Sequence, residues 1–225
     1  MIEHIISLIA PHTCLICKQE GALICKTCRI ALPSAPSQCY RCGVISEQNK
    51  TCSRCRRQSP LDSVHVATSY EGASKDLLWQ LKFNRARQAA RTAADLMNNM
   101  MPRLPDSTLL VHVPTATARV RLRGYDQAAL ISRSFAAHRG LPWAGVLARI
   151  TNDRQVGARR HVRIQQMQNA YRVVLPHMVQ NRHVVLVDDV ITTGSSLESA
   201  AQVLIAAGAR SISAVVFARA NTTKV

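Results

Sequence analysis

The stretch VVLVDDVITTGSSL at residues 184–197 joins an apolar run to two acids and then to a hydroxyl-rich turn. Residues 183–187 are β-branched and apolar almost throughout, which predicts a central strand that is buried on both faces. Apolar residues then recur with helical period from Leu197 to Ile205, and Gly208 follows as a stop signal. The segment therefore predicts a strand, a turn and a helix in direct succession.

The turn has the composition of a phosphate-binding loop. Backbone amides at the start of a helix attract anions, hydroxyl groups add donors, and a glycine lets the backbone approach closely. We expect the phosphate to be bound by the five residues of this turn, Thr192, Thr193, Gly194, Ser195 and Ser196. The alternative is that Ser195 and Glu198 form only a capping box, which leaves the preceding acids unexplained because such acids are costly to desolvate.

Asp188 and Asp189 lie between the predicted strand and the turn. Adjacent strand residues point to opposite faces, so at least one of the two carboxylates can face a ligand bound at the turn. A carboxylate in that position suits ribose hydroxyls or a magnesium ion rather than the phosphate itself. The two aspartates therefore predict the sugar side of a phosphate-ribose site.

Eight cysteines form four C-x-x-C pairs within the first 55 residues: Cys14, Cys17, Cys25, Cys28, Cys39, Cys42, Cys52 and Cys55. Two such pairs complete the tetrahedral shell of a zinc ion and leave no open position, so two structural zinc sites are predicted. Sequential pairing closes shorter loops than an interleaved arrangement and is favoured on chain entropy. A secreted disulfide framework is the alternative, but the first residues lack the features of an export signal.

From residue 64 onward, apolar runs of strand length alternate with stretches of helical period, which predicts an α/β domain with a mostly parallel sheet flanked by helices. We place a double zinc ribbon at residues 1–62 and this larger domain at residues 63–225. The expected strands are 64–70, 109–113, 144–148, 183–187 and 211–218, and the expected helices are 73–82, 86–101, 126–139 and 197–205. Residues 149–168 are expected to form a long loop, either a lid over a site or a flexible connection.

The charge balance indicates phosphate-bearing ligands. The formal net charge is +16, and residues 63–225 carry 21 basic against 9 acidic side chains. Apolar residues make up 47% of the chain, which excludes wholesale disorder. No apolar run reaches the roughly 18 residues of a membrane-spanning helix, so we expect a soluble, cytoplasmic protein without membrane insertion.

The segment 184–197 resembles the phosphoribosyl-pyrophosphate signature of type I phosphoribosyltransferases. The order of parts resembles the ComF (GntX-like) family of competence-associated proteins, which join a cysteine-rich zinc ribbon to a phosphoribosyltransferase-like domain. The likeness extends to LLWQLKF at 77–83, VPTATARVRLRGYDQA at 113–128 and the blocks RITNDRQ and QNAYRV between residues 149 and 173. Asp126 and Gln166 depart from asparagines that members often carry.

The resemblance implies that Asp188 and Asp189 bind the ribose hydroxyls with magnesium, as the catalytic pair of an active enzyme, and that the turn 192–196 binds the 5′-phosphate. Pyrophosphate would be held by basic and hydroxyl side chains: Lys82, Thr115 and one or more of Arg119, Arg121 and Arg123. The implied function is binding of phosphoribosyl pyrophosphate, or of a related ribose phosphate or nucleotide, in DNA uptake or the use of external DNA. The alternative is an active phosphoribosyltransferase of nucleotide salvage, which transfers phosphoribosyl to a base and releases pyrophosphate.

Direct handling of DNA is a second hypothesis, with single-stranded DNA and DNA-uptake proteins as partners. Ten arginines fall between residues 119 and 163, against two aspartates. A solvated basic face is the alternative, and only 4% of residues are aromatic. Tyr125 is the one ring expected to stack on a base, since four others lie in apolar periodic runs and are predicted to be core: Trp79, Phe83, Phe135 and Phe217.

Overall fold

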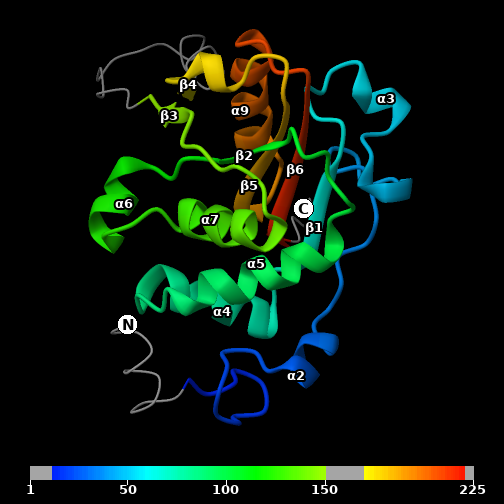
Figure 1. Ribbon diagram of the computed structural model, residues 1–225. Helices are drawn as coiled ribbons and strands as arrows, with labels where there is room; N and C mark the ends of the chain where they lie inside the picture. Colours follow the sequence, from blue (N-terminus) through cyan, green and yellow to red (C-terminus); the bar gives the residue numbers. More distant parts are fainter. Residues whose placement is uncertain (1–11, 151–169, 221–225) are drawn as a thin grey trace, which may run out of the picture.

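A computed structural model describes residues 12–150 and 170–220, and most of the predicted loop 149–168 lies outside these residues (Figure 1). Four strands form one parallel sheet in the order β1-β6-β5-β2. Their bounds are Val64–Ser69 for β1, Leu109–His112 for β2, His183–Ile191 for β5 and Ser211–Arg219 for β6. The prediction of a parallel sheet is confirmed.

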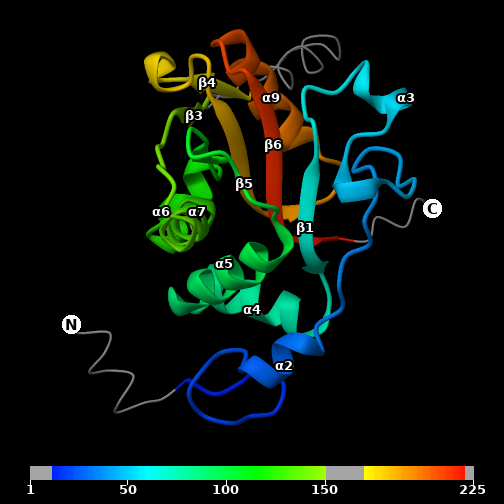
Figure 2. The same cartoon turned by 45° about the vertical axis from the view of Figure 1, so that its right-hand side comes forward.

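Helices cover both faces of the sheet (Figures 1 and 2). On one face lie α4 (Gly72–Phe83), α5 (Gln88–Met100) and α7 (Gln127–Arg139), and on the other lies α9 (Ser195–Ala206). The side chains of β5 alternate between the two cores, because successive strand residues point to opposite faces. Val184 and Leu186 pack in the core that holds α9, whereas Val185 and Val187 pack in the core that holds α5 and α7. The predicted burial of this strand on both faces is confirmed.

Several elements differ from the prediction. Strand β5 continues four residues beyond Val187 and includes both aspartates, because β6 pairs with it as far as Ile191. A short helix, α6 (Thr117–Arg123), was not predicted. The weak strand expected at 144–148 is displaced to β3 (Leu147–Arg149), which pairs in antiparallel fashion with β4 (Tyr171–Val173), and a single 3-10 turn, η2 (Pro176–Met178), precedes β5.

Helix α7 begins and ends as its sequence predicts. The carboxylate of Asp126 accepts hydrogen bonds from the amides of Ala128 and Ala129, so this residue is the N-cap. Gly140 ends the helix with a φ of 63°, a left-handed conformation that favours glycine. These two residues fix the position of α7 beside β2 and β5.

The four cysteines of the first ribbon, Cys14, Cys17, Cys25 and Cys28, bring their sulfur atoms within 4.8 Å of one another. The ribbon includes α2 (Lys26–Ile30) and packs against the face that carries α4 and α5 (Figure 2). Leu23 and Ile24 join the core on that face, and Arg29 forms a 2.9 Å ion pair with Asp95 of α5. The first ribbon is thus part of the packed structure and not a free appendage.

The second ribbon groups Cys39, Cys42, Cys52 and Cys55 in the same way, so the predicted sequential pairing is confirmed. It carries η1 (Glu47–Asn49) and α3 (Ser53–Arg56), and Tyr40 joins the core on the α9 face. Between the ribbons the chain passes the end of β1, where the carbonyl of Pro33 accepts bonds from Thr68 and Ser69. The two ribbons therefore lie on opposite faces of the sheet, and the border at residue 62 stays a prediction.

Each C-x-x-C pair forms a tight turn, called a knuckle below, and the geometry of these knuckles fits zinc. Burial acts to raise the pKa of the Cys14 thiol, but the backbone amides of Cys25 and Cys17 donate to its sulfur and lower that pKa to about 6. In the same cluster, burial and the neighbouring thiols raise the pKa of Cys28 to about 12. Four sulfurs this close together therefore need a cation such as zinc before all of them can be thiolates.

Among residues 12–150 and 170–220, none of the helices has the length and apolar character that a membrane span requires.

The prediction for the aromatic residues is half wrong. Phe135 and Phe217 are fully buried, as expected, but the Trp79 and Phe83 side chains are 50% and 58% exposed. The core-facing side of α4 is formed by its leucines instead, and Trp79 and Phe83 lie one helical turn apart on the outer side with their ring centroids 5.8 Å apart. The core contacts only one stripe of α4, which the leucines fill, so an apolar residue outside that stripe stays exposed.

Candidate functional site

A cavity of about 290 Å³ opens at the carboxyl ends of β2 and β5. The ladder between these strands ends where His112 pairs with Val187, while β5 continues to Ile191. Beyond Val187, β5 has no β2 residue paired with it, and its residues 188–190 line one wall of the cavity. The loop 113–116 that follows β2 forms the opposite wall. Ligands of open α/β sheets bind at such a place, outside the carboxyl ends of the strands.

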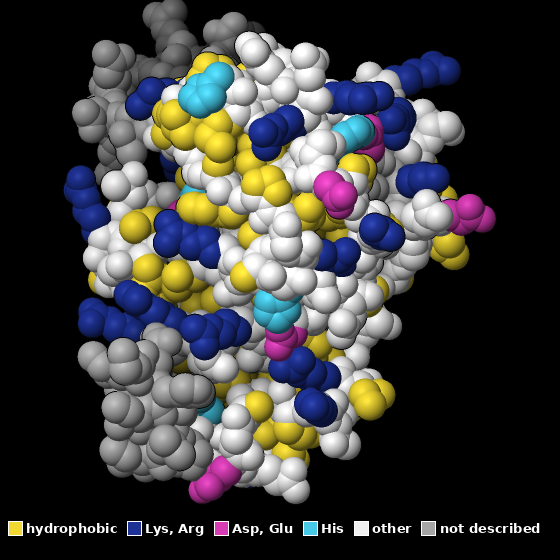
Figure 3. Space-filling model, viewed as in Figure 1, with side chains coloured by type: hydrophobic (Ala, Val, Ile, Leu, Met, Phe, Trp, Pro, Cys, Tyr) yellow, Lys and Arg dark blue, Asp and Glu magenta, His cyan; other side chains and the backbone are white. Residues whose placement is uncertain are grey.

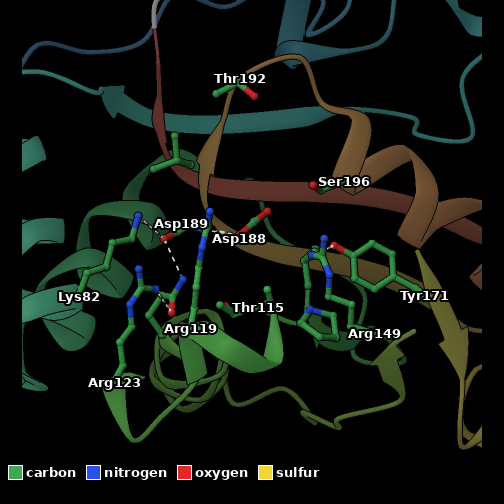
Figure 4. A pocket seen from close by; sticks show the side chains of 15 residues that line it. Lys82, Thr115, Arg119, Arg123, Arg149, Tyr171, Asp188, Asp189, Thr192 and Ser196 are labelled. Carbon is green, nitrogen blue, oxygen red and sulfur yellow. Dashed lines mark hydrogen bonds and ion pairs between the residues drawn. The ribbon is translucent and has the colours of Figure 1, made fainter. Parts of the chain in front are cut away.

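Both predicted aspartates line this cavity, and they differ in their contacts (Figure 4). The Nζ atom of Lys82 lies 2.6 Å from Oδ2 of Asp189, and Gln127 donates a second bond of 3.3 Å to the same oxygen. Asp188 accepts the amide of Asp189 at 2.8 Å through Oδ1. Lys82 was predicted to bind pyrophosphate, but in this structure its ammonium is paired with Asp189.

These contacts shift the pKa values of the two carboxyls in opposite directions. Burial and the neighbouring Asp189 raise the pKa of Asp188 well above the ordinary value. Burial acts in the same direction on Asp189, but the charge of Lys82 outweighs it and lowers the pKa of that carboxyl. Asp189 thus keeps its negative charge, whereas Asp188 gains most from a cation or from hydroxyl donors placed beside it.

The predicted phosphate turn lies across the cavity from α6 (Figure 4). Thr192 and Ser196 line the cavity, whereas the hydroxyls of Thr193 and Ser195 bind each other at 2.7 Å. Within the described part of the chain, no backbone acceptor lies within hydrogen-bond reach of the amides of Thr192 and Ser196. These amides are therefore available to an anion, and α9 begins beside them with its dipole favouring negative charge.

The capping box of Ser195 and Glu198, the alternative interpretation of this turn, does not form. Gly194, with a φ of 84°, is the N-cap residue of α9 and carries no side chain to cap it. The carboxylate of Glu198 binds Tyr40 and Arg41 of the second ribbon instead. The hydroxyl-rich turn is thus not explained as a helix cap.

Three arginines were predicted as candidates for binding pyrophosphate, and all three lie on α6. Arg119 and Arg123 line the cavity, whereas the exposed Arg121 does not. Arg123 also donates a 2.7 Å bond to Gln127. The Thr115 amide and hydroxyl both donate to Asp126, at 2.8 and 3.0 Å, so these hydrogens hold the loop in place. A phosphate could not take them without breaking that contact.

Three polar side chains of the cavity were missed by sequence reasoning: Gln127, Arg149 and Tyr171. Arg149 of β3 lies opposite Tyr171 of β4 and donates a 3.3 Å bond to its hydroxyl. Both belong to blocks that carry the family resemblance, which is the one signal that could have marked them. Their meeting depends on an antiparallel register that the sequence does not show.

The donor set around the aspartates fits magnesium, which prefers carboxylate and phosphate oxygens. Asp188 is the carboxylate that could take part, because Asp189 is already neutralised by Lys82. The eight thiolates fit zinc in two four-ligand sites.

Two family models match the chain. The phosphoribosyl transferase domain matches residues 136–225, which include β5, the turn and α9. The double zinc ribbon domain matches residues 5–56, which include all eight cysteines. The two matches agree with the α/β domain and the ribbons described above.

Similar proteins span nearly the whole chain. The DNA utilization protein YhgH of Salmonella typhi is 33% identical over 221 residues, which cover 91% of this chain and 96% of that protein. Competence protein F of Haemophilus influenzae is 29% identical over 210 residues, covering 88% and 90% of the two chains. Among solved structures, an allosteric regulatory enzyme of purine biosynthesis matches 56% of this chain and 25% of its own, with 20% identity and a TM-score of 0.40.

The aspartate pair predicts opposite effects on stability. A carboxyl whose pKa is raised on folding destabilises the folded state once the pH exceeds the ordinary pKa of aspartate. Asp188→Asn removes this carboxyl and should therefore raise the melting temperature at pH 7.5. We expect a rise of about 2–4 °C, the shift that corresponds to roughly 1 kcal/mol in a chain of this size. The gain should shrink as pH falls and vanish below the ordinary pKa of aspartate, where the carboxyl is protonated in both states.

Asp189→Asn is the matched control, because it leaves the ammonium of Lys82 without its partner. It should lower the melting temperature at pH 7.5. Thermal unfolding followed by circular dichroism measures both variants. Shifts of the same sign would contradict the assignment of charge within the pair.

Proposed function

The chain belongs to the ComF-like family that includes the DNA utilization protein YhgH and competence protein F, and we propose that its cavity binds phosphoribosyl pyrophosphate or a related ribose phosphate in the use of external DNA. The observation that carries the proposal is the convergence on one cavity of a helix-start turn, an aspartate pair and three arginines. A ligand with a phosphate at one end, a sugar in the middle and a diphosphate at the other presents the complementary charges. Free nucleotides share only part of this pattern.

Each part of the ligand would meet a different element. The amides and hydroxyls of Thr192 and Ser196 would bind the 5′-phosphate, and Asp188 would accept bonds from the ribose hydroxyls. Arg119 and Arg123 would bind the diphosphate, since guanidinium groups match phosphate oxygens in pairs. When bound, magnesium supplies positive charge that neutralises the diphosphate, and Asp188 is the protein group that fits it.

Transfer of the phosphoribosyl group to a base is the alternative for the same cavity. In that reaction a ring nitrogen of the base forms a bond to the anomeric carbon, and the bond from that carbon to pyrophosphate breaks. The electron pair leaves with pyrophosphate, and the proton of the ring nitrogen passes to solvent. Asp188 would steady the positive charge on the sugar, and the arginines would hold the leaving group. The described lining favours binding without transfer, because its one aromatic ring, Tyr171, is 2% exposed and offers a base no stacking surface.

A second ligand surface adjoins the cavity on α4 and α6. Trp79 and Phe83 are the exposed aromatic pair described above, and the guanidinium carbon of Arg123 lies 5.6 Å from the centre of the Phe83 ring. Because Arg123 also lines the cavity, the aromatic pair and the cavity share one continuous surface. Lysine and arginine side chains gather where α6 lies beside α4 (Figure 3).

This surface, which comprises Trp79, Phe83 and the arginines Arg85, Arg87 and Arg123, matches the chemistry of single-stranded DNA. Unpaired bases stack on exposed rings, and arginines bind the phosphates between them. Tyr125, the ring expected to stack, supports the surface from beneath: its hydroxyl donates to the carbonyl of Leu81 and Arg87 covers its ring. We propose that single-stranded DNA binds here as a second ligand.

Arg119→Ala and Arg121→Ala test donor binding as a matched pair on one helix. Isothermal titration with phosphoribosyl pyrophosphate and magnesium should show binding to the natural protein and a loss of about tenfold or more in Arg119→Ala. Such a loss follows from removing charge-assisted hydrogen bonds worth about 1.5–3 kcal/mol. Arg121→Ala, outside the cavity, should bind within about twofold of the natural protein.

Absence of donor binding in the natural protein, or equal losses in both variants, would contradict the proposal. Pyrophosphate release is measured in the same samples after addition of each common nucleobase. We expect no release above the rate without protein, whichever base is added. Release that requires one particular base would establish the transfer alternative.

Trp79→Ala tests the proposed DNA surface. Stacking on an aromatic ring contributes about 1–3 kcal/mol per base, so affinity for a thymidine oligonucleotide should fall about fivefold or more in fluorescence-anisotropy titrations. Folding should be unaffected because the ring is half exposed. Ile205→Ala, an exposed apolar residue of α9, is the control and should bind DNA normally; equal affinities of all three proteins would exclude this surface.

A further inference from the structure

The second zinc ribbon touches the phosphate turn directly. Tyr40 and Arg41 lie between Cys39 and Cys42, inside the first knuckle of that ribbon. The ring of Tyr40 is almost fully buried, at 4% exposure, and it lies against the backbone of Gly194. A Cβ atom on residue 194 would be 2.8 Å from Cδ2 of that ring, so glycine is required here by close packing as well as by its positive φ.

A hydrogen-bonded network joins the same knuckle to the first turn of α9. The hydroxyl of Tyr40 donates to Oε1 of Glu198 at 2.6 Å and contacts Oγ of Ser59 at 2.5 Å. The Nε atom of Arg41 lies 2.9 Å from the same carboxylate oxygen. Glu198, which could have capped its own helix, is instead the anchor of the ribbon.

We propose that the second zinc ribbon positions the phosphate turn, with Tyr40 as the positioning residue, so that zinc in that ribbon and a ribose phosphate in the cavity bind cooperatively. This inference rests on the proposed function of the cavity. The two sites are the four sulfurs of Cys39, Cys42, Cys52 and Cys55 and the turn at residues 192–196. The Tyr40 contact connects them.

The physical reason is that the turn has little support of its own. Thr192, Thr193, Ser195 and Ser196 are exposed, and Gly194 is the buried member that packs on the rest of the protein. Zinc fixes the knuckle by holding Cys39 and Cys42, and the knuckle holds Tyr40 behind Gly194. Without the metal the ring loses this constraint, and the amides would have to be ordered when the phosphate binds.

Binding linkage makes the effect reciprocal. If zinc increases the affinity of the turn for phosphate, the phosphate must increase the retention of zinc by the same factor. The first ribbon provides an internal control, because it is anchored to α5 on the other face through Arg29 and Asp95. None of its described residues lines the cavity.

The first experiment measures the binding of ribose 5-phosphate to the full chain by titration calorimetry. Tyr40→Ala should lose about tenfold in affinity, whereas Tyr40→Phe, which keeps the ring behind Gly194 but loses the bond to Glu198, should lose about twofold to fivefold. Tyr70→Ala is the control, a partly buried tyrosine of the other core, and should retain affinity. Losses of equal size in the three variants, or none in Tyr40→Ala, would overturn the inference.

The second experiment follows the transfer of zinc to a coloured chelator. Saturating ribose 5-phosphate should slow the loss of one of the two zinc ions about tenfold and leave the other unchanged. Tyr40→Ala should release both ions at rates that do not depend on the ligand. Protection of neither ion, or equal protection of both, would overturn the coupling.

Hydrogen exchange separates this inference from the proposed function, because it needs no ligand. The Glu198 amide donates to the carbonyl of Gly194, and the amides that follow are bonded within α9. Amides of residues 198–201 should therefore exchange faster in Tyr40→Ala than in the natural protein, with α5 and β6 unchanged in both. If the natural protein fails to bind ribose 5-phosphate, the proposed function fails while the exchange result still decides whether Tyr40 positions the turn. Unchanged exchange at residues 198–201 would show that it does not.

Discussion

The site depends on one constraint: β5 must be buried on both faces and still carry two acids at its end. The strand achieves this because β6 pairs with it over its whole length, whereas β2 stops at His112. The residues that follow Val187 are therefore held rigidly in a ladder on one side and open to a cavity on the other. Carboxylates on a strand end are placed more firmly than on a loop, and the turn that follows inherits this position.

The burial of the acids creates an electrostatic cost that is only partly offset. Lys82 neutralises Asp189, and Asp188 keeps a raised pKa with no cation of the described chain paired to it. A buried carboxyl with a raised pKa and no paired cation is typical of sites whose charge is balanced by a bound ligand. Arg119, Arg123 and Arg149 provide the opposite charge in the same cavity. The exposed rings of α4 lie beside Arg123, which is why we propose a DNA surface there.

The ribbons show how small metal-bound units become part of a larger fold. Neither contains enough apolar residues for a core of its own, and each docks on a different face of the sheet by an arginine inside or next to a cysteine knuckle. Arg29 pairs with an aspartate of α5, and Arg41 pairs with Glu198 at the start of α9. Because α9 begins at the phosphate turn, the second ribbon is close to the proposed chemistry while the first supports the opposite face.

Local patterns in the sequence determined the parallel sheet, the order of helices, the sequential cysteine clusters and the composition of the turn. These features depend on periodicity and short spacing, which are visible within about twenty residues. Only the tertiary structure decided that Tyr40 meets Glu198, 158 positions away, that Lys82 pairs with Asp189, and that Trp79 is exposed. Such contacts depend on strand register and on which face of a helix packs against the core. Neither can be read from any one segment of the sequence.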